Sequence, residues 1–393
     1  MQTRKLLPHF LWMVLILVVF CFGYSTNGLA PLVVKPSTRM GHQMVYDSSN
    51  QQIILFGGTK GQAHQLLDDT WAYEFTTNTW TALNPATKPS PRSQSSMVYD
   101  PVHQKVILFG GASTSGFKDD TWIFDYLSNQ WTQVFPNIKP PARHSHPLIY
   151  DSTTQKLILF GGYGLDDVLL NDTWVYDYTN NTWTELTPTL SPIARYGHPM
   201  VYDPVIQKSI LFGGNTWTAG NQNDTWIYDY SSNTWTKLAF STHPSARKWS
   251  SMVYDPTNHQ TILFGGASGA EGYLGDTWIY QSSINEWSQI PTSIAPSGRT
   301  LSALAYDSVN QQVILFGGRE AIDTLDDTWA YDPASTIWTV MDPASSSSTT
   351  STLSSSTSTV PANSTDFLNY EVFLLASGVL GIYFWYRRKT HLR

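Results

Sequence analysis

The residues of this chain with the most obvious capacity for chemistry are arginines and aspartates that recur at a fixed spacing. Six arginines lie about 52 residues apart, and each is followed some 28 to 30 residues later by the aspartate of an Asp-Thr-Trp sequence. The arginines are Arg39, Arg92, Arg143, Arg195, Arg247 and Arg299, and the aspartates are Asp69, Asp120, Asp172, Asp224, Asp276 and Asp327. Six guanidinium groups could line an anion site around one axis. Their regular repetition favours a structural role instead, in which each arginine forms an ion pair with the aspartate of its own unit.

Three histidines also share one place in the repeat. His42, His146 and His198 stand three residues after an opening arginine, where the other units carry Ser95, Ser250 and Ser302. Imidazole is a common zinc ligand, but units one and four of a six-membered ring lie opposite each other, so a shared site would require all three side chains to reach the axis. We therefore expect no metal centre and no cofactor. We also expect no catalytic residue, since the chain has no motif with a nucleophile and base, paired carboxylates or a phosphate loop.

The candidate binding residues are those that depart from the repeat at the end of the unit where the loops vary most. Trp217 and Trp249 fill no repeat position and come from adjacent units, and an exposed indole suits a sugar ring or an apolar patch of a partner. The alternative is that they fill gaps within loops. The full candidate set is Trp217, Trp249, Tyr163, Tyr196, Tyr273, Arg319 and Glu320. Further departures at the same end are Lys60, His64, Phe117, Lys118, Asp166, Asp167 and Glu271.

The elements that must position these residues are short strands. Each unit predicts four strands separated by turns, which in unit four are 199–202, 209–212, 225–230 and 234–238. The second strand is apolar on both faces and ends in two structural glycines, which allow backbone conformations that a Cβ forbids. These pairs are Gly57 and Gly58, Gly110 and Gly111, Gly161 and Gly162, Gly213 and Gly214, Gly265 and Gly266, and Gly317 and Gly318. Such a sheet cannot bury both faces alone, whereas six sheets in a ring can.

Together the opening Arg, Tyr-Asp, Gly-Gly, Asp-Thr-Trp and a second Trp nine residues later resemble the Kelch repeat. Residues 39–340 are similar to the galactose-oxidase central domain and to attractin and muskelin propellers. The resemblance implies an all-β, six-bladed propeller of four-stranded antiparallel blades. The expected blades are 39–90, 91–141, 142–193, 194–245, 246–297 and 298–340. Copper-radical chemistry of the galactose-oxidase type is excluded because it needs a cysteine cross-linked to a tyrosine, and the one cysteine, Cys21, precedes the repeats.

The two ends of the chain predict its location. Residues 1–25 have the basic start and apolar run of a signal peptide, which could also remain as an uncleaved anchor. Residues 341–366 form a Ser/Thr-rich stalk, 367–386 an apolar stretch long enough for one transmembrane helix, and 387–393 a basic cytoplasmic tail. We therefore expect the repeats outside the cell on a single-pass anchor. A sorting signal for attachment to the cell surface is the alternative interpretation of the C-terminal segment.

Charge completes the sequence-based interpretation. Without the two basic tails and Glu371 the chain has 17 basic and 29 acidic residues, a charge of about −12, which disfavours nucleic-acid binding. We expect a monomeric propeller that binds an extracellular protein or glycan as an adhesion module. The alternatives are a sugar-acting enzyme of the Kelch mutarotase or epimerase type, with charged groups converging at the channel mouth, and a passive component of the envelope.

Overall fold

The computed structural model describes residues 34–269 and 271–341. The predicted signal peptide, transmembrane helix and basic tail, and all of the predicted stalk except Met341, lie outside this part. Within the described residues no helix has the length and apolar character needed to cross a membrane.

Each repeat unit forms one antiparallel sheet whose main strands lie in chain order. Unit one contains β1 (Gln43–Asp47), β2 (Gln52–Phe56), β5 (Thr70–Glu74) and β6 (Thr79–Leu83). Unit two contains β8 (Ser96–Asp100), β9 (Lys105–Phe109), β12 (Thr121–Asp125) and β13 (Gln130–Val134). Unit three contains β15 (Leu148–Asp151), β16 (Lys156–Gly164), β17 (Leu169–Asp177) and β18 (Thr182–Leu186). Unit four contains β19 (Met200–Asp203), β20 (Lys208–Phe212), β23 (Thr225–Asp229) and β24 (Thr234–Leu238). Unit five contains β25 (Ser251–Asp255), β26 (Gln260–Ser268), β27 (Gly272–Gln281) and β28 (Glu286–Ile290). Unit six contains β29 (Ala303–Asp307), β30 (Gln312–Glu320), β31 (Asp323–Asp332) and β32 (Ile337–Val340).

Short strands extend these sheets at one end. They are β3 (Thr59–Lys60), β4 (Gln65–Leu66), β7 (Arg92–Ser93), β10 (Ala112–Ser113), β11 (Gly116–Phe117), β14 (Arg143–His144), β21 (Asn215–Thr216) and β22 (Gly220–Asn221). A 3-10 turn, η1 (Leu165–Asp167), joins β16 to β17. In every unit the segment after Gly-Gly is therefore a hairpin, where the sequence predicted only a loop. The ladder shifts register at the glycine pair in units three, five and six, and both glycines of the pair have positive φ in every unit.

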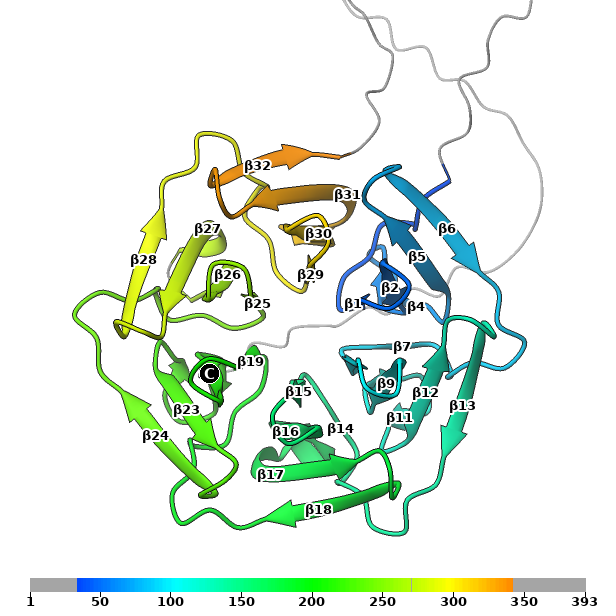
Figure 1. The fold of residues 1–393 in the computed structure, drawn as a ribbon, viewed down its shortest axis with the longest axis horizontal. Coiled ribbons are helices and arrows are strands. Elements are labelled where there is room, and N and C mark those ends of the chain that lie inside the picture. Colours follow the sequence, from blue (N-terminus) through cyan, green and yellow to red (C-terminus); the bar gives the residue numbers. More distant parts are fainter. Residues whose placement is uncertain (1–33, 270, 342–393) are drawn as a thin grey trace, which may run out of the picture. The chain divides into compact units, whose positions relative to one another are not determined.

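The six sheets lie around a common centre (Figure 1). The first strand of each sheet is innermost and the fourth is outermost, as β19 and β24 show in unit four. Each first strand contacts the first strands of the units on either side, and β1 contacts β29, so the series returns to its start. In unit four the observed strands agree with the predicted ones to within one residue at each end.

Neighbouring sheets are joined by the second tryptophan of each unit. The Trp131 ring packs on Phe56 of the preceding unit, with ring centroids 5.1 Å apart, and its Nε1 donates to Oγ1 of Thr70 at 3.1 Å. The same pair of contacts joins Trp80 to Phe316 and Thr328, so unit one is attached to unit six as the others are to their neighbours. The apolar residues of the second strands between these joints are fully buried, which confirms that both of their faces are covered.

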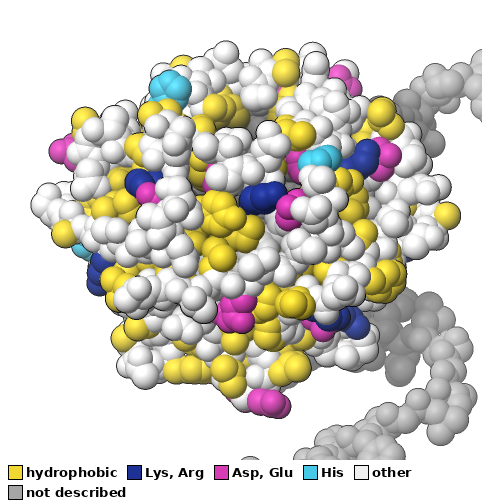
Figure 2. Space-filling model, turned by 60° about the horizontal axis from the view of Figure 1, so that its bottom comes forward, with side chains coloured by type: hydrophobic (Ala, Val, Ile, Leu, Met, Phe, Trp, Pro, Cys, Tyr) yellow, Lys and Arg dark blue, Asp and Glu magenta, His cyan; other side chains and the backbone are white. Residues whose placement is uncertain are grey.

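Most of the lysines in the described part of the chain lie close to an aspartate. Lysines at the start of second strands pair with aspartates at the end of third strands, for example Lys156 with Asp177 at 2.7 Å and Lys208 with Asp229 at 2.6 Å. On the face drawn in Figure 2, most Lys and Arg side chains (dark blue) lie beside an Asp or Glu side chain (magenta). Apolar and uncharged polar side chains lie between these pairs.

Candidate functional site: the channel-mouth face

The opening residues of the units and the hairpins after Gly-Gly meet at one end of the ring, called here the channel-mouth face. Antiparallel bridges join the two segments in each unit, for example Tyr196 with Asn215, Lys248 with Ala267, and Thr300 with Arg319. The expectation that the variable segments share one end with the opening residues is thus met by the backbone geometry.

The six arginines lie behind this face as ion pairs. Each is almost completely buried and donates through both terminal nitrogens to its aspartate, as Arg195 does to Asp224 at 2.7 and 3.0 Å. The same guanidinium donates to the carbonyl of the first glycine of the pair, here Gly213 at 2.8 Å. Burial by itself would raise the pKa of Asp224, but the hydrogen bonds and the charge of Arg195 outweigh it and lower the pKa. The predicted pairing is confirmed in all six units, and these arginines form no anion site.

The three repeat histidines are packing residues. Each ring lies edge-on against a phenylalanine of the preceding unit: His42 on Phe316, His146 on Phe109 and His198 on Phe160, all with centroids 5.6 Å apart. Burial lowers the pKa of His42 and of His198 to about 3, helped by the charges of Arg39 and Arg195. The three rings thus occupy three separate junctions. No cluster of His, Cys, Asp or Glu suited to a metal occurs among the described residues.

A ring of backbone hydrogen bonds surrounds the channel mouth. The residue two places after each opening arginine donates its N–H to the carbonyl of the equivalent residue in the preceding unit, at 2.7 to 3.1 Å. The six members, all with φ between 53° and 65°, are Gly41, Gln94, Ser145, Gly197, Trp249 and Leu301. Trp249 therefore does fill a repeat position, which corrects the sequence-based interpretation. The position was not recognised from the sequence because it requires a backbone with positive φ and no particular side chain.

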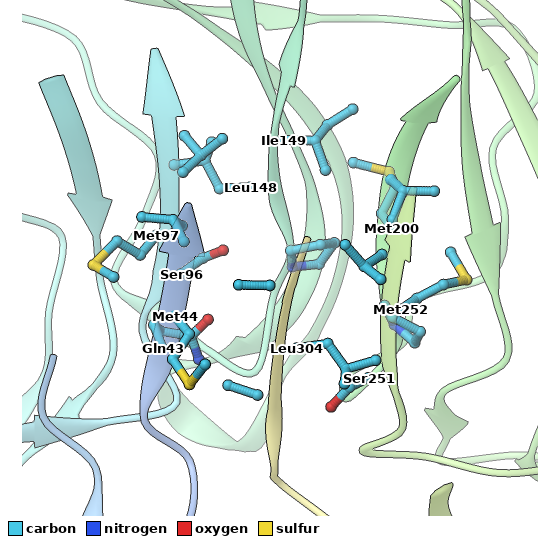
Figure 3. A pocket seen from close by; sticks show the side chains of 18 of the residues that line it. Gln43, Met44, Ser96, Met97, Leu148, Ile149, Met200, Ser251, Met252 and Leu304 are labelled. Atoms are coloured by element: carbon cyan, nitrogen blue, oxygen red, sulfur yellow. The ribbon is translucent and has the colours of Figure 1, made fainter. Parts of the chain in front are cut away.

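Two hollows meet at this ring. The central channel, of about 580 Å³, is lined by the first strands, with apolar side chains such as Met97, Leu148 and Leu304 and the hydroxyl of Ser96 (Figure 3). None of its lining residues is Asp, Glu, Lys or Arg within the described part. The second hollow, of about 650 Å³, is called here the mouth hollow. Gln94, Trp249 and Leu301 of the hydrogen-bonded ring line both spaces and form the boundary between them.

Four of the predicted binding residues form a continuous aromatic arc. Tyr163 lies edge-on to Tyr196 at 5.5 Å and to Trp217 at 5.8 Å, and Tyr196 lies 6.0 Å from Trp249. Lys248 Nζ lies 4.1 Å from the centroid of the Trp249 ring and donates to the Tyr196 hydroxyl at 2.9 Å. These contacts bring together side chains from three consecutive units.

Hydrogen bonds hold the arc in place and leave part of it open to solvent. Trp217 is 60% exposed, and its Nε1 donates to the carbonyl of Asp167 at 3.2 Å, while the Tyr163 hydroxyl donates to the same residue's carboxylate at 2.7 Å. Trp217 is thus a fixed aromatic surface that reaches into solvent, which favours a ligand contact over the filling of a gap.

The other three predicted residues lie elsewhere on the face. Tyr273 and Arg319 line the mouth hollow, and both donate to the carbonyl of Ala321, at 3.1 and 3.0 Å. Glu320 lies at the hairpin tip of unit six, where it accepts a hydrogen bond from Ser297 at 2.6 Å. It is not among the described residues that line the hollow.

Sequence reasoning missed two members of the face, Lys248 and His144. The His144 ring stacks on Tyr163 with centroids 5.0 Å apart and extends the arc toward Phe117 of unit two. Both residues directly follow an opening arginine, as the predicted binding residue Tyr196 does. Their place in the repeat could therefore have identified them from the sequence.

The fold and this face define the class of protein, a β-propeller of Kelch repeats. Residues 19–193 and 155–365 match the KLHDC2/KLHL20/DRC7 Kelch-repeats domain, and the chain belongs to this family.

Similar curated proteins share the repeats within diverse longer chains. Multiple epidermal growth factor-like domains protein 8 of Mus musculus is 26% identical over 63% of this chain and 9% of its own length. The dynein alpha chain of the flagellar outer arm of Chlamydomonas reinhardtii is 24% identical over 72% of this chain and 7% of its own. Human Kelch domain-containing protein 10 is 26% identical over 66% of this chain and 62% of its own. The chain therefore spans less than two thirds of each of these relatives.

Proposed function

We propose that this protein is a surface-displayed binding module, a complete six-bladed propeller that takes its partner on the channel-mouth face. The observation that carries the proposal is the aromatic arc of Tyr163, Tyr196, Trp217 and Trp249, because it is contiguous, comes from three units and includes a largely exposed indole. Exposed aromatic clusters on a rigid frame are typical of binding surfaces. Kelch propellers generally bind proteins, and a protein or glycan partner fits this arc.

Display outside the cell is part of the same proposal. The apolar run near the N-terminus, the Ser/Thr-rich segment 341–366 and the apolar stretch 367–386 with its basic flank support a single-pass anchor on a stalk. A tethered module of this kind suits adhesion, where the partner lies on another surface.

The rival function, an enzyme acting on sugars, required charged groups converging at the channel mouth. Arg195, the arginine that such an enzyme could use, is buried and paired with Asp224, and His42 and His198 lie at separate junctions. No observation on the described residues favours catalysis over binding.

The test compares the full-length purified protein with a Trp217→Ala, Trp249→Ala variant for binding to intact cells and to a panel of glycans and cell-surface proteins. We expect the wild type to bind and the double variant to lose about tenfold in affinity, which is about 1.4 kcal/mol. Trp217→Ala alone should lose part of it, and this exposed side chain can be removed without unfolding the protein.

The matched control is Phe135→Ala, which removes an exposed aromatic ring just after the outermost strand of unit two. Its affinity should equal that of the wild type. Equal affinities for the wild type and the folded double variant would refute the arc as the binding surface.

A further inference from the structure

Within residues 34–269 and 271–341, positive charge without a carboxylate partner is confined to the channel-mouth face. The described part contains 17 lysines and arginines, and 13 of them lie within 4.0 Å of an aspartate carboxylate. The four without such a partner among the described residues are Lys60, Lys118, Lys248 and Arg319. All four belong to opening segments or to the hairpins after Gly-Gly. Because acidic residues outnumber basic residues in the described part of the chain, this grouping of positive charge favours an anion-binding site on the channel-mouth face.

Arg319 projects this charge into the mouth hollow. Its Nε donates to the carbonyl of Ala321 at 3.0 Å, while its two terminal nitrogens have no partner in the described part of the chain. No Asp or Glu is among the described residues that line the hollow. The nearby acids are engaged elsewhere: Glu320 accepts from Ser297, and Glu271 accepts from Ser245 at 3.2 Å. Asp323, at the start of β31, is exposed and does not line the hollow.

Two of the residues that line the hollow have a buried polar atom without a partner in the described part of the chain. Thr59 is 4% exposed and lines the hollow, and its Oγ1 has no hydrogen-bond partner among the described residues. The Trp249 Nε1 is likewise buried and without a partner. Leaving such groups unsatisfied costs about 1–3 kcal/mol each. Both atoms are closed to solvent, so the case for a ligand rests on Arg319 and not on them.

The remaining lining resembles the surroundings of a sugar more than those of a peptide side chain. Ser93, Gln94 and Thr300, with hydroxyl and amide side chains, line the hollow together with the aromatic residues Trp249 and Tyr273. Hydroxyls and amides complement the hydroxyls of a pyranose, and aromatic rings complement its C–H face. The volume of about 650 Å³ lies in the range of small-ligand sites, roughly 300–1,000 Å³.

We propose that the mouth hollow binds a uronate unit of an acidic polysaccharide, with Arg319 holding its carboxylate and Trp249 contacting its ring. The neighbouring sugars extend over the aromatic arc, since Trp249 belongs to both the hollow and the arc. Lys248, whose ammonium lies over Trp249, supplies a second positive charge at the point where the polysaccharide leaves the hollow. This inference rests on the proposed function and names the class of its partner.

The experiment measures binding of the full-length protein to short oligogalacturonate and to the same oligosaccharide with its carboxylates methyl-esterified. The two probes share their rings and differ in charge. We expect the acid to bind about tenfold more tightly than the ester, and Arg319→Gln to remove about tenfold from the affinity for the acid alone. Lys105→Gln is the matched control, since Lys105 pairs with Asp125 away from this face, and it should leave both affinities unchanged. Binding of the acid should also weaken as salt is raised.

If an oligosaccharide binds, three outcomes would overturn the inference. They are equal binding of acid and ester, an unchanged affinity in folded Arg319→Gln, and tighter binding of a poly-glutamate peptide than of the oligogalacturonate. The last outcome would assign the hollow to acidic peptides. If none of the oligosaccharides binds while binding to cells still depends on Trp217, this inference fails and the proposed function stands. If the wild type binds neither cells nor any of the oligosaccharides, both this inference and the proposed function fail.

Discussion

Lowering the pH from about 7.5 to about 5 is expected to destabilise this protein through its three buried histidines. In the native state the pKa of His42 and of His198 is about 3, and that of His146 is also well below 6.5, with burial as the main cause in each. In the unfolded chain all three return to about 6.5. The unfolded state therefore binds more protons below pH 6.5. The contribution of the neutral histidines to the free energy of unfolding is complete above pH 6.5 and is lost as the pH falls toward their native pKa.

The magnitude follows from the difference between the two states. At pH 5 the protonation of each histidine stabilises the unfolded chain by about 2 kcal/mol relative to the native state. Three of them therefore lower the free energy of unfolding by about 6 kcal/mol. That is a large part of the ~5–15 kcal/mol that stabilises a typical domain. The aspartates add nothing in this range, because the pKa values of the paired Asp69, Asp120 and Asp224 are lowered and these groups stay ionised.

The assay is guanidinium chloride unfolding followed by tryptophan fluorescence at several pH values between 7.5 and 5. His42→Ser is the informative variant, since serine occupies the equivalent position in three of the six units. It should remove about one third of the loss that the three buried histidines cause. The triple variant with His146→Ser and His198→Ser should keep only the loss caused by the partly buried His144, whose pKa burial lowers to about 4. An unfolding free energy that stays constant from pH 7.5 to 5 in the wild type, or a full loss in the triple variant, would refute the reasoning.

Two further predictions concern the repeat itself. Asp224→Ala should cost about 3–5 kcal/mol in unfolding free energy, because it leaves the buried Arg195 unpaired, whereas Asp69→Ala should cost less. The side chain of Asp69 is 36% exposed against 8% for Asp224, so water can reach the arginine that it leaves; equal costs in denaturant titrations would contradict this. Gly213→Ala should destabilise by roughly 2–4 kcal/mol, because its added Cβ would lie 2.8 Å from a carbonyl oxygen at φ +62°. Gly220→Ala, at φ +68° with open space around it, should cost only about 1 kcal/mol, and thermal unfolding of both variants checks the difference.

The contacts within one unit could be predicted from sequence because they depend on local strand pairing. The opening arginine and its aspartate lie at the ends of neighbouring segments of one sheet, and the repetition of both residues revealed their pairing. The same holds for the second strand, where a continuous apolar run such as Ile210 to Phe212 required cover on both faces. By contrast, the hairpin after Gly-Gly was predicted only as a loop, because its strands are two residues long in units one, two and four and carry no apolar alternation.

The sequence by itself determined the repeat, the strand order of a unit, the ion pairs and the end of the ring where variable residues gather. Only the tertiary structure decided which of those residues meet. Tyr163, Tyr196 and Trp249 come from three units and form one arc, while Glu320 turns to Ser297. The ring of backbone hydrogen bonds that includes Trp249 also spans all six units. The physical reason is that contacts within a sheet follow from register along the chain. Contacts between sheets depend on how each sheet is rotated against the next, which side-chain packing at the junctions sets and residue spacing does not encode.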